Sequence, residues 1–190
     1  ENFTNVTIIT FDSESLLSKL CGVFLINDVN IHDAKIFTRK DSIIIDNFNV
    51  SDFRTNKPLE TSKFVKIESD FLKMEQGMLQ LNTELKKHKS KWWRLENKLF
   101  KKPGRISIKF EESKKYTIID IHSPDRLGFL FQVTSKLHDL GLNIYFAKIL
   151  TMGTDIVDSF YVLDSNKKKV SKNFYPVITD ELKACIEEIL

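Results

Sequence analysis

Residues 143–149 read NIYFAKI and residues 30–36 read NIHDAKI, and the two stretches lie 113 positions apart. Shifting the whole chain by that distance aligns further similar residues in the same order. They are Phe3-Thr4 with Tyr116-Thr117, Val6 with Ile119, Ile8 with Ile121, Asp12 with Asp125, Leu17 with Leu130, Thr38 with Thr151, and, after a one-residue gap, Asp46, Phe48, Val50 and Asp52 with Asp158, Phe160, Val162 and Asp164. Matches that stay in order with a single gap indicate a duplicated unit.

Each copy shows the same order of predicted elements. Runs rich in β-branched residues predict strands, and apolar residues at helical spacing predict helices. The order is β-α-β-β-α, which with one more strand is the ferredoxin-like split βαβ. The fold class is therefore α+β, with two βαββαβ units joined by a long helical segment. The expected strands are 5–11, 30–38, 43–51, 116–122, 143–151 and 156–163, and the expected second helices are 61–87 and 174–190.

The boundary between the copies depends on residues 105–110, which alternate apolar and polar side chains as a half-buried strand does. Pro103-Gly104 gives a turn just before them. This strand either closes the first sheet or adds to the second, and the fourth strand of the second copy is absent, donated from elsewhere or supplied by this same segment. We expect domains at 1–104 and 105–190.

Composition limits the other classes of function. The net charge of +3 is too small to indicate a nucleic-acid or membrane partner. Trp92 and Trp93 lie in a basic stretch, which we interpret as a solvated helix face rather than a nucleic-acid patch. Cys21 and Cys185 match no metal or redox spacing and favour a reducing, cytoplasmic location. Because the chain opens with Glu1, we expect it to be a piece of a longer protein.

Three motifs of the second copy carry a resemblance to ACT domains. The stretch from Asp125 to Leu130, DRLGFL, resembles the D-R-P-G-L-L loop that opens the first ACT helix, with Leu127 where proline is usual. Residues 141–151 are similar to the strand that follows, and residues 158–164, DSFYVLD, to the D-x-F-Y-V-x-D third strand. The loop of the first copy departs further, since DSESLL at residues 12–17 has no glycine.

Two such copies with a helical insert and a P-G-R-I strand resemble the C-terminal regulatory region of the bacterial PII uridylyltransferase/uridylyl-removing family. The resemblance implies a module that senses glutamine and reports to catalytic domains upstream, which transfer UMP to a PII signal protein or remove it. No catalytic motif is visible in this sequence, so we expect no catalysis, no catalytic residue, no metal ligand and no cofactor here, with Mg²⁺ expected in the parent enzyme.

The loop at the start of each first helix is the candidate ligand site. A helix start offers unpaired N–H groups and partial positive charge, which suit the carboxylate of an amino acid. Gly128 allows close approach of a ligand, and Asp125 is a candidate partner for its ammonium group. The predicted ligand-binding residues are Asp125, Arg126, Gly128, Phe129, Asn143, Ile144, Asp12 and Asn30.

Structural roles compete with these assignments. Asp12 and Asp125 are also candidate helix caps, worth about 1 kcal/mol each. Asn30 and Asn143 equally suit tight turns. Asp46 and Asp158 share strand parity with core residues, so we expect each carboxylate to accept a hydrogen bond from the backbone or a lysine.

Three functions remain in competition. A ligand held between the loop of one copy and the second strand of another would favour one packing of the two domains. A variant of this first function is a stand-alone amino-acid sensor of the same fold. The second function is a ligand-free module that docks a PII-type partner or dimerises. RNA binding through the sheet ranks last, because the aromatic strand signature that stacks bases is missing. Pairing within one chain and pairing between chains as a homodimer both stay open.

Overall fold

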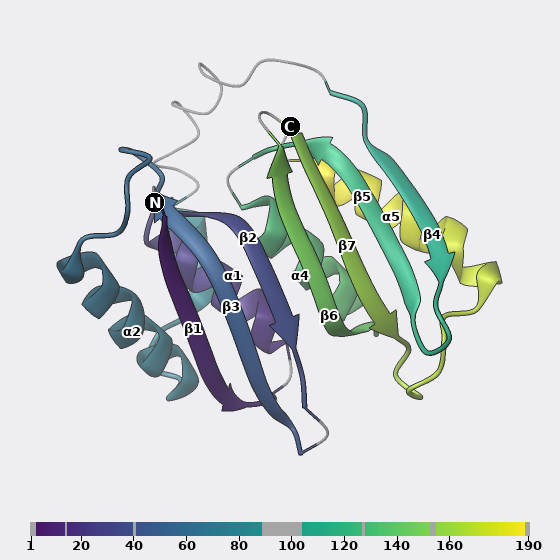
Figure 1. Ribbon diagram of the computed structural model, residues 1–190, viewed down its shortest axis with the longest axis horizontal. Helices are drawn as coiled ribbons and strands as arrows, with labels where there is room; N and C mark the ends of the chain where they lie inside the picture. Colours follow the sequence, from purple (N-terminus) through teal and green to yellow (C-terminus); the bar gives the residue numbers. More distant parts are fainter. Residues whose placement is uncertain are drawn as a thin grey trace.

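The two copies pair edge to edge in one seven-stranded antiparallel sheet, in the order β1-β3-β2-β6-β7-β5-β4 (Figure 1). The computed structural model describes residues 3–13, 15–39, 41–88, 104–126, 128–152 and 155–188. The basic stretch with Trp92 and Trp93 lies outside these residues. The strands are β1 (Thr4–Phe11), β2 (Val29–Phe37), β3 (Ile43–Asp52), β4 (Ser107–Glu112), β5 (Thr117–Pro124), β6 (Asn143–Met152) and β7 (Asp155–Leu163).

The helices are α1 (Leu16–Ile26), α2 (Thr61–Glu75), α4 (Phe129–Asp139) and α5 (Tyr175–Glu187), with a short 3-10 turn at Lys172–Phe174. Helices α1, α4 and α5 lie over one face of this sheet, α2 lies outward of β1, and none of the described helices covers the other face (Figure 1). Residues 81–88 are also helical. Each copy therefore has the predicted order β-α-β-β-α, and the α+β class is confirmed.

The core lies between the helices and the sheet face that they cover. Every second residue of a strand points to this face, so Phe48 and Val50 of β3 and Phe160 and Val162 of β7 are fully buried. Phe24 of α1 packs edge-on against Phe48, with ring centroids 5.1 Å apart. The apolar alternation in the sequence therefore marks the helix-facing side of each strand correctly.

The seam between the copies is the pairing of β2 with β6. Lys35 lies opposite Lys148 at the middle of the paired segment. These two lysines are equivalent in the sequence repeat, so an approximate two-fold axis passes between them. On the covered face α1 packs against α4 across the same axis. There the equivalent residues Cys21 and Thr134 lie next to each other, both buried.

Strand β4 belongs to the sheet half of the second copy. It pairs antiparallel with β5, with Ile108 opposite Ile121. That is the place of the fourth strand in a split βαβ, here supplied by the segment in front of the unit rather than behind it. The alternative that residues 105–110 close the first sheet is wrong.

The predicted continuous helix over 61–87 is also wrong, because the chain breaks at Gly77. This glycine has φ +70°, and Met78 N–H donates to Lys73 O (2.8 Å) while Gly77 N–H donates to Met74 O (3.0 Å). These two bonds form a Schellman motif, which ends α2. The apolar residues continue at helical spacing across Gly77, so the sequence pattern does not reveal the break. Gly141 ends α4 with the same pair of bonds, as the sequence predicts.

Reversing one lysine charge at the seam should stabilise the protein. Lys35 and Lys148 are exposed and directly opposite, so their like charges repel. We expect Lys148→Glu or Lys35→Glu alone to raise the free energy of unfolding by about 0.2–1 kcal/mol. Urea denaturation at low salt measures the change. The double variant restores a like-charge pair and should lose the gain. Additive effects of the two substitutions would contradict the observed register.

Candidate functional site

Two clefts lie at opposite ends of the β2–β6 seam and are related by the approximate two-fold axis. In the first, called the Asp125 cleft, the loop before α4 faces Val29, Asn30 and Ile31 at the start of β2. In the second, called the Asp12 cleft, the loop before α1 faces Asn143, Ile144 and Tyr145 at the start of β6. Each cleft therefore takes one wall from each copy.

All eight predicted ligand-binding residues line these clefts. Asp125, Arg126, Gly128 and Phe129 line the Asp125 cleft together with Asn30. Asp12 lies with Asn143 and Ile144 in the other. The loop of the second copy thus shares a cleft with Asn30 of the first copy, and the loop of the first copy shares a cleft with Asn143 of the second. Their role in binding stays a prediction, but their placement across the seam follows the arrangement expected for a ligand held between two copies.

The helix starts in both clefts use a left-handed residue instead of a capping side chain. Gly128 before α4 has φ +85° and its equivalent Ser15 before α1 has φ +54°, and neither helix has a side-chain cap. The capping role considered for Asp12 and Asp125 is therefore wrong. A side chain at Gly128 would be strained, and its Cβ would also lie 2.9 Å from Cδ2 of Leu25 across the cleft.

The loop before α4 is also held by its own hydrogen bonds. Phe129 N–H donates to Arg126 O (3.0 Å), so this amide at the helix start is not available to a ligand. The Arg126 guanidinium donates to Asp125 O (2.8 Å). Burial raises the pKa of Asp125, while Arg126 acts in the opposite direction through its charge and its backbone N–H. The loop is therefore held in place by its own hydrogen bonds, and the Asp125 carboxyl group, whose pKa is raised by burial, lines the cleft.

The two asparagines do not adopt the left-handed turn conformation that was the alternative for them. Asn30 and Asn143 lie within or at the start of strands β2 and β6, and neither is among the residues with positive φ in the described chain. The Asn143 side chain donates to Asp164 O (3.3 Å), a structural contact. No side chain of the described residues hydrogen-bonds the Asn30 amide, which leaves it able to bind a ligand.

Asp158 and Asp46 add a second, buried carboxyl group to each cleft. Asp158 is 1% exposed and lines the Asp125 cleft. Its Oδ1 accepts a hydrogen bond from Leu150 N–H (3.1 Å), and Asp46 Oδ1 accepts one from Phe37 N–H (3.2 Å) in the Asp12 cleft. The predicted backbone hydrogen bonds are confirmed. The other Asp158 oxygen, Oδ2, has no partner among the described residues.

Burial changes the protonation of both groups. Burial, together with the charge of nearby Asp125, raises the pKa of Asp158 to about 8. Burial also raises the pKa of Asp46 to about 7, and the neighbouring Asp12 adds to the effect. Both carboxyl groups therefore take up protons near neutral pH. The sequence showed that these aspartates face the core, but it did not place them among the predicted binding residues, because strand parity alone does not show how near each one lies to the loop that follows the neighbouring strand of its own copy.

The clefts differ in free space although they are equivalent in sequence. The Asp125 cleft has a cavity volume of about 40 Å³, and the Asp12 cleft about 360 Å³. One buried water needs roughly 10–15 Å³ on this measure. The Asp125 cleft thus has room for a few water molecules, and a larger ligand has to separate the loop from Leu25 and β2.

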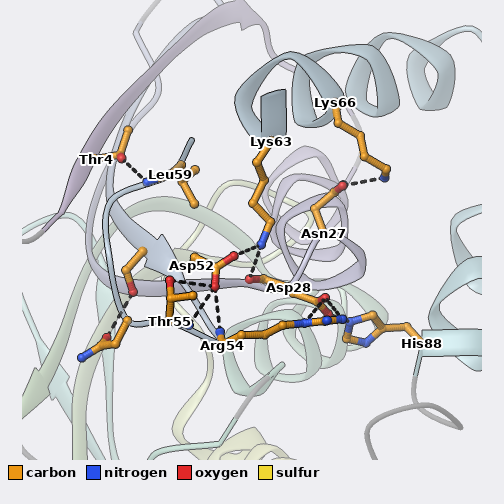
Figure 2. A network of polar contacts seen from close by, with 12 residues as sticks. Thr4, Asn27, Asp28, Asp52, Arg54, Thr55, Leu59, Lys63, Lys66 and His88 are labelled. Carbon is orange, nitrogen blue, oxygen red and sulfur yellow. Dashed lines mark hydrogen bonds and ion pairs between the residues drawn. The ribbon is translucent and has the colours of Figure 1, made fainter. Parts of the chain in front are cut away.

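A polar network lies directly beside the Asp125 cleft and ties the start of β2 to the helical insert (Figure 2). Asp28, with φ +54°, precedes Val29 and accepts hydrogen bonds from Arg54 Nη2 (2.9 Å) and Nε (3.2 Å). His88 Nε2 lies 2.6 Å from the other Asp28 oxygen. Lys63 of α2 binds Asp52 and the Asp28 carbonyl. Burial acts to raise the pKa of Asp52, but the hydrogen bonds from Lys63 and Thr55 lower it overall.

Other kinds of site are not found in the described residues. No group of three His, Cys, Asp or Glu side chains within them is arranged to hold a metal ion. No helix within them has the length and apolar character needed to cross a bilayer.

The fold is that of a pair of ferredoxin-like ACT repeats joined in one sheet. Aspartate kinase from Synechocystis superposes with a TM-score of 0.52 at 13% identity, over 99% of this chain and 27% of that one. This likeness shows the fold alone. No family model matches the sequence.

Two sequence relatives are bifunctional uridylyltransferase/uridylyl-removing enzymes. The chain is 33% identical over 169 residues to the bifunctional uridylyltransferase/uridylyl-removing enzyme of Azospirillum brasilense, covering 88% of this chain and 18% of the relative. It is 31% identical over 186 residues to the same enzyme of Rhodospirillum rubrum, covering 97% of this chain and 20% of the relative. The chain thus spans about a fifth of the relatives' length. The chain is homologous to the matched fifth of these enzymes. The resemblance to the uridylyltransferase/uridylyl-removing family that the sequence motifs indicated is confirmed.

The buried carboxyl groups should make stability fall as pH rises. Asp158 has a pKa of about 8 in the folded state against about 3.9 when unfolded, so the folded state holds an extra proton between these values. Its contribution is complete below about pH 4 and is lost as pH rises to about 8. Asp46 adds the same trend up to about pH 7. Asp158→Asn should flatten the dependence by up to about 1.4 kcal/mol per pH unit.

Chemical denaturation between pH 4 and 9 measures this slope. Asp155→Asn, at an exposed position, is the matched control and should leave the slope unchanged. An unaltered slope in Asp158→Asn would show that this carboxyl group is ionised in the folded protein.

Proposed function

We propose that this chain is an amino-acid-sensing regulatory module of a bifunctional uridylyltransferase/uridylyl-removing enzyme, with glutamine as its ligand. In this role it couples nitrogen status to catalytic domains elsewhere in the same polypeptide, which act on a PII signal protein. The resemblance to the regulatory region of that family supports the choice of ligand and partner. The observation that carries the proposal is the pair of clefts, because each is built half from one copy and half from the other.

The polar groups of the Asp125 cleft suit an amino acid. Glutamine carries hydrogen-bond donors and acceptors, and Asp158 Oδ2 is a buried carboxyl oxygen that lacks a partner among the described residues. With a pKa of about 8, the Asp158 carboxyl group is protonated at neutral pH, and its Oδ2–H can donate to the side-chain carbonyl oxygen of glutamine. A buried unpaired polar atom costs about 1–3 kcal/mol, which a ligand partner would recover. Asp125 and the Asn30 amide supply further polar contacts on the two walls.

The mechanism is a shift between two packings of the seam. In the described state Leu25 lies close to Gly128 and the Asp125 cleft is nearly closed. A ligand that enters it separates the α4 loop from β2, and it favours the open packing only by the difference in its affinity for the two states. The start of β2 is bonded through Asp28 to Arg54 and His88, so a shift at the cleft reaches the helical insert.

Glutamine should therefore stabilise the folded chain. We expect the melting temperature to rise with glutamine concentration, and stability to increase by about 2.7 kcal/mol at a hundred times the dissociation constant. Differential scanning fluorimetry and isothermal calorimetry measure the effect, and the other common amino acids serve as competitors. A flat response to every amino acid would exclude a complete ligand site in this chain.

Single substitutions assign the response to one cleft. Asn30→Ala and Asp158→Asn alter the Asp125 cleft, whereas Asn143→Ala and Asp46→Asn alter the Asp12 cleft. Asn166→Ala, in an exposed turn, is the control. Loss of binding in one pair alone identifies the functional cleft.

A second function, docking of a PII-type partner without a small ligand, is favoured by the open face of the sheet. Ile9 is 67% exposed and Phe11 73% exposed, and they lie opposite Ile45 and Ile43 of β3. Apolar side chains gathered on a sheet face are typical of protein contacts.

Substitution of this face separates the two functions. If the module docks PII, Phe11→Ser should weaken PII binding at least about tenfold in a pull-down or calorimetric titration, since a buried aromatic contact contributes 1.4 kcal/mol or more. Glutamine should then have no effect on the melting temperature. Lys109→Ser, at an exposed position on the far edge of the sheet, is the control. Unchanged PII binding in Phe11→Ser rejects this function for the open face.

A further inference from the structure

None of the described strands occupies the outer position beside β1 in the first copy. In the second copy this position is occupied by β4, which pairs with β5 and reaches it through a tight turn with Ser113 N–H bonded to Tyr116 O (2.9 Å). β1 is the equivalent of β5, but among the described residues it pairs only with β3 and forms the outer edge of the sheet. Figure 1 shows α5 behind β4 and β5, whereas α2 lies outward of β1 with no strand in front of it.

Matched hydrogen bonds fix which residues of the two copies are equivalent around this position. Val170 N–H donates to Thr117 Oγ1 of β5 (3.0 Å), and Leu59 N–H donates to Thr4 Oγ1 of β1 (2.7 Å). Counting forward by the same number of residues from Val170 and from Leu59 leads to Tyr175 and Phe64. These two aromatic side chains therefore occupy the same place on α5 and on α2.

The two aromatic residues differ in their partners. Tyr175 stacks on Phe110 of β4, with ring centroids 4.0 Å apart and planes 9° apart. Phe64 is 41% exposed and stacks on no aromatic ring of the described residues. Phe110 thus has no counterpart on Phe64 among the described residues of the first copy.

The helix-facing residues of β1 are also less buried than their equivalents in β5. Ile121 of β5, which lies beside Ile108 of β4, is fully buried, and Ser123 is 2% exposed. Their equivalents Ile8 and Thr10 are only half-buried. A strand beside β1 would cover both residues and would satisfy the open backbone edge, which is otherwise a site for unwanted pairing.

We propose that this position is a strand-docking groove, and that its occupant is the segment directly preceding Glu1 in the full-length protein. This segment pairs antiparallel with β1 and places a large apolar or aromatic side chain on Phe64. The order follows from the duplication, because β4 directly precedes the first strand of its own unit. The curated relatives are about five times longer than this chain. The added strand completes the βαββαβ unit of the first copy.

Hydrogen exchange in the full-length protein tests the proposal with an internal scale. β5 is flanked on both sides, and β4 is an edge strand. If the groove is filled, peptides covering β1 should exchange as slowly as those covering β5, about tenfold or more slower than those covering β4. Exchange of β1 at the rate of β4 would overturn the proposal.

Substitution on α2 tests the contact with Phe64. Phe64→Ser in the full-length protein should accelerate exchange of β1 about tenfold or more while peptides of β5 and β7 stay protected, which shows that the fold is intact. Val65→Ser, also exposed on α2, is the matched control and should change nothing. If both variants leave β1 equally protected, the proposed stacking is wrong.

A second copy of the chain is the competing occupant. Protection of β1 that disappears at low protein concentration would show pairing between molecules and would overturn the assignment to the preceding segment. Protection independent of concentration supports it.

Discussion

The antiparallel pairing of β2 with β6 turns two small units into one sheet and creates both clefts. Neither cleft exists within a single copy, because each needs a loop from one unit and a strand start from the other. The hydrogen bonds of the seam are supported on the covered face by the contact of α1 with α4. Both clefts therefore lie on the same seam and share its two strands.

The sequence predicted the order of elements in both copies and eight residues that line the clefts. It could do so because aligning one copy with the other shows which positions are equivalent. Equivalent positions such as Asn30 and Asn143 lie at the same place in each unit, and a two-fold arrangement then brings loop and strand together. The place of β4 was not predictable from its alternation, since a half-buried strand looks the same beside either sheet. The break at Gly77 was hidden because the apolar period continues through a Schellman motif.

The buried carboxyl groups show a further limit of sequence reasoning. Strand parity places Asp46 and Asp158 on the covered face, but their protonation depends on how completely the neighbouring copy excludes water. The seam supplies that exclusion, and it leaves Asp158 Oδ2 without a partner in the described residues. A group of this kind is costly for stability and suits a role in binding, since a polar ligand removes the cost.

The left-handed residue at each helix start has a consequence for how the two copies diverged. Gly128 allows the backbone there to turn freely, whereas Ser15 holds a similar φ at a higher conformational cost. In an assembly of two identical chains, any substitution would appear in both sites at once. Because both units belong to one polypeptide, each site mutates separately, so one cleft can narrow around Gly128 while its twin widens around Ser15. Because the two units are joined in one polypeptide, their clefts do not have to stay identical.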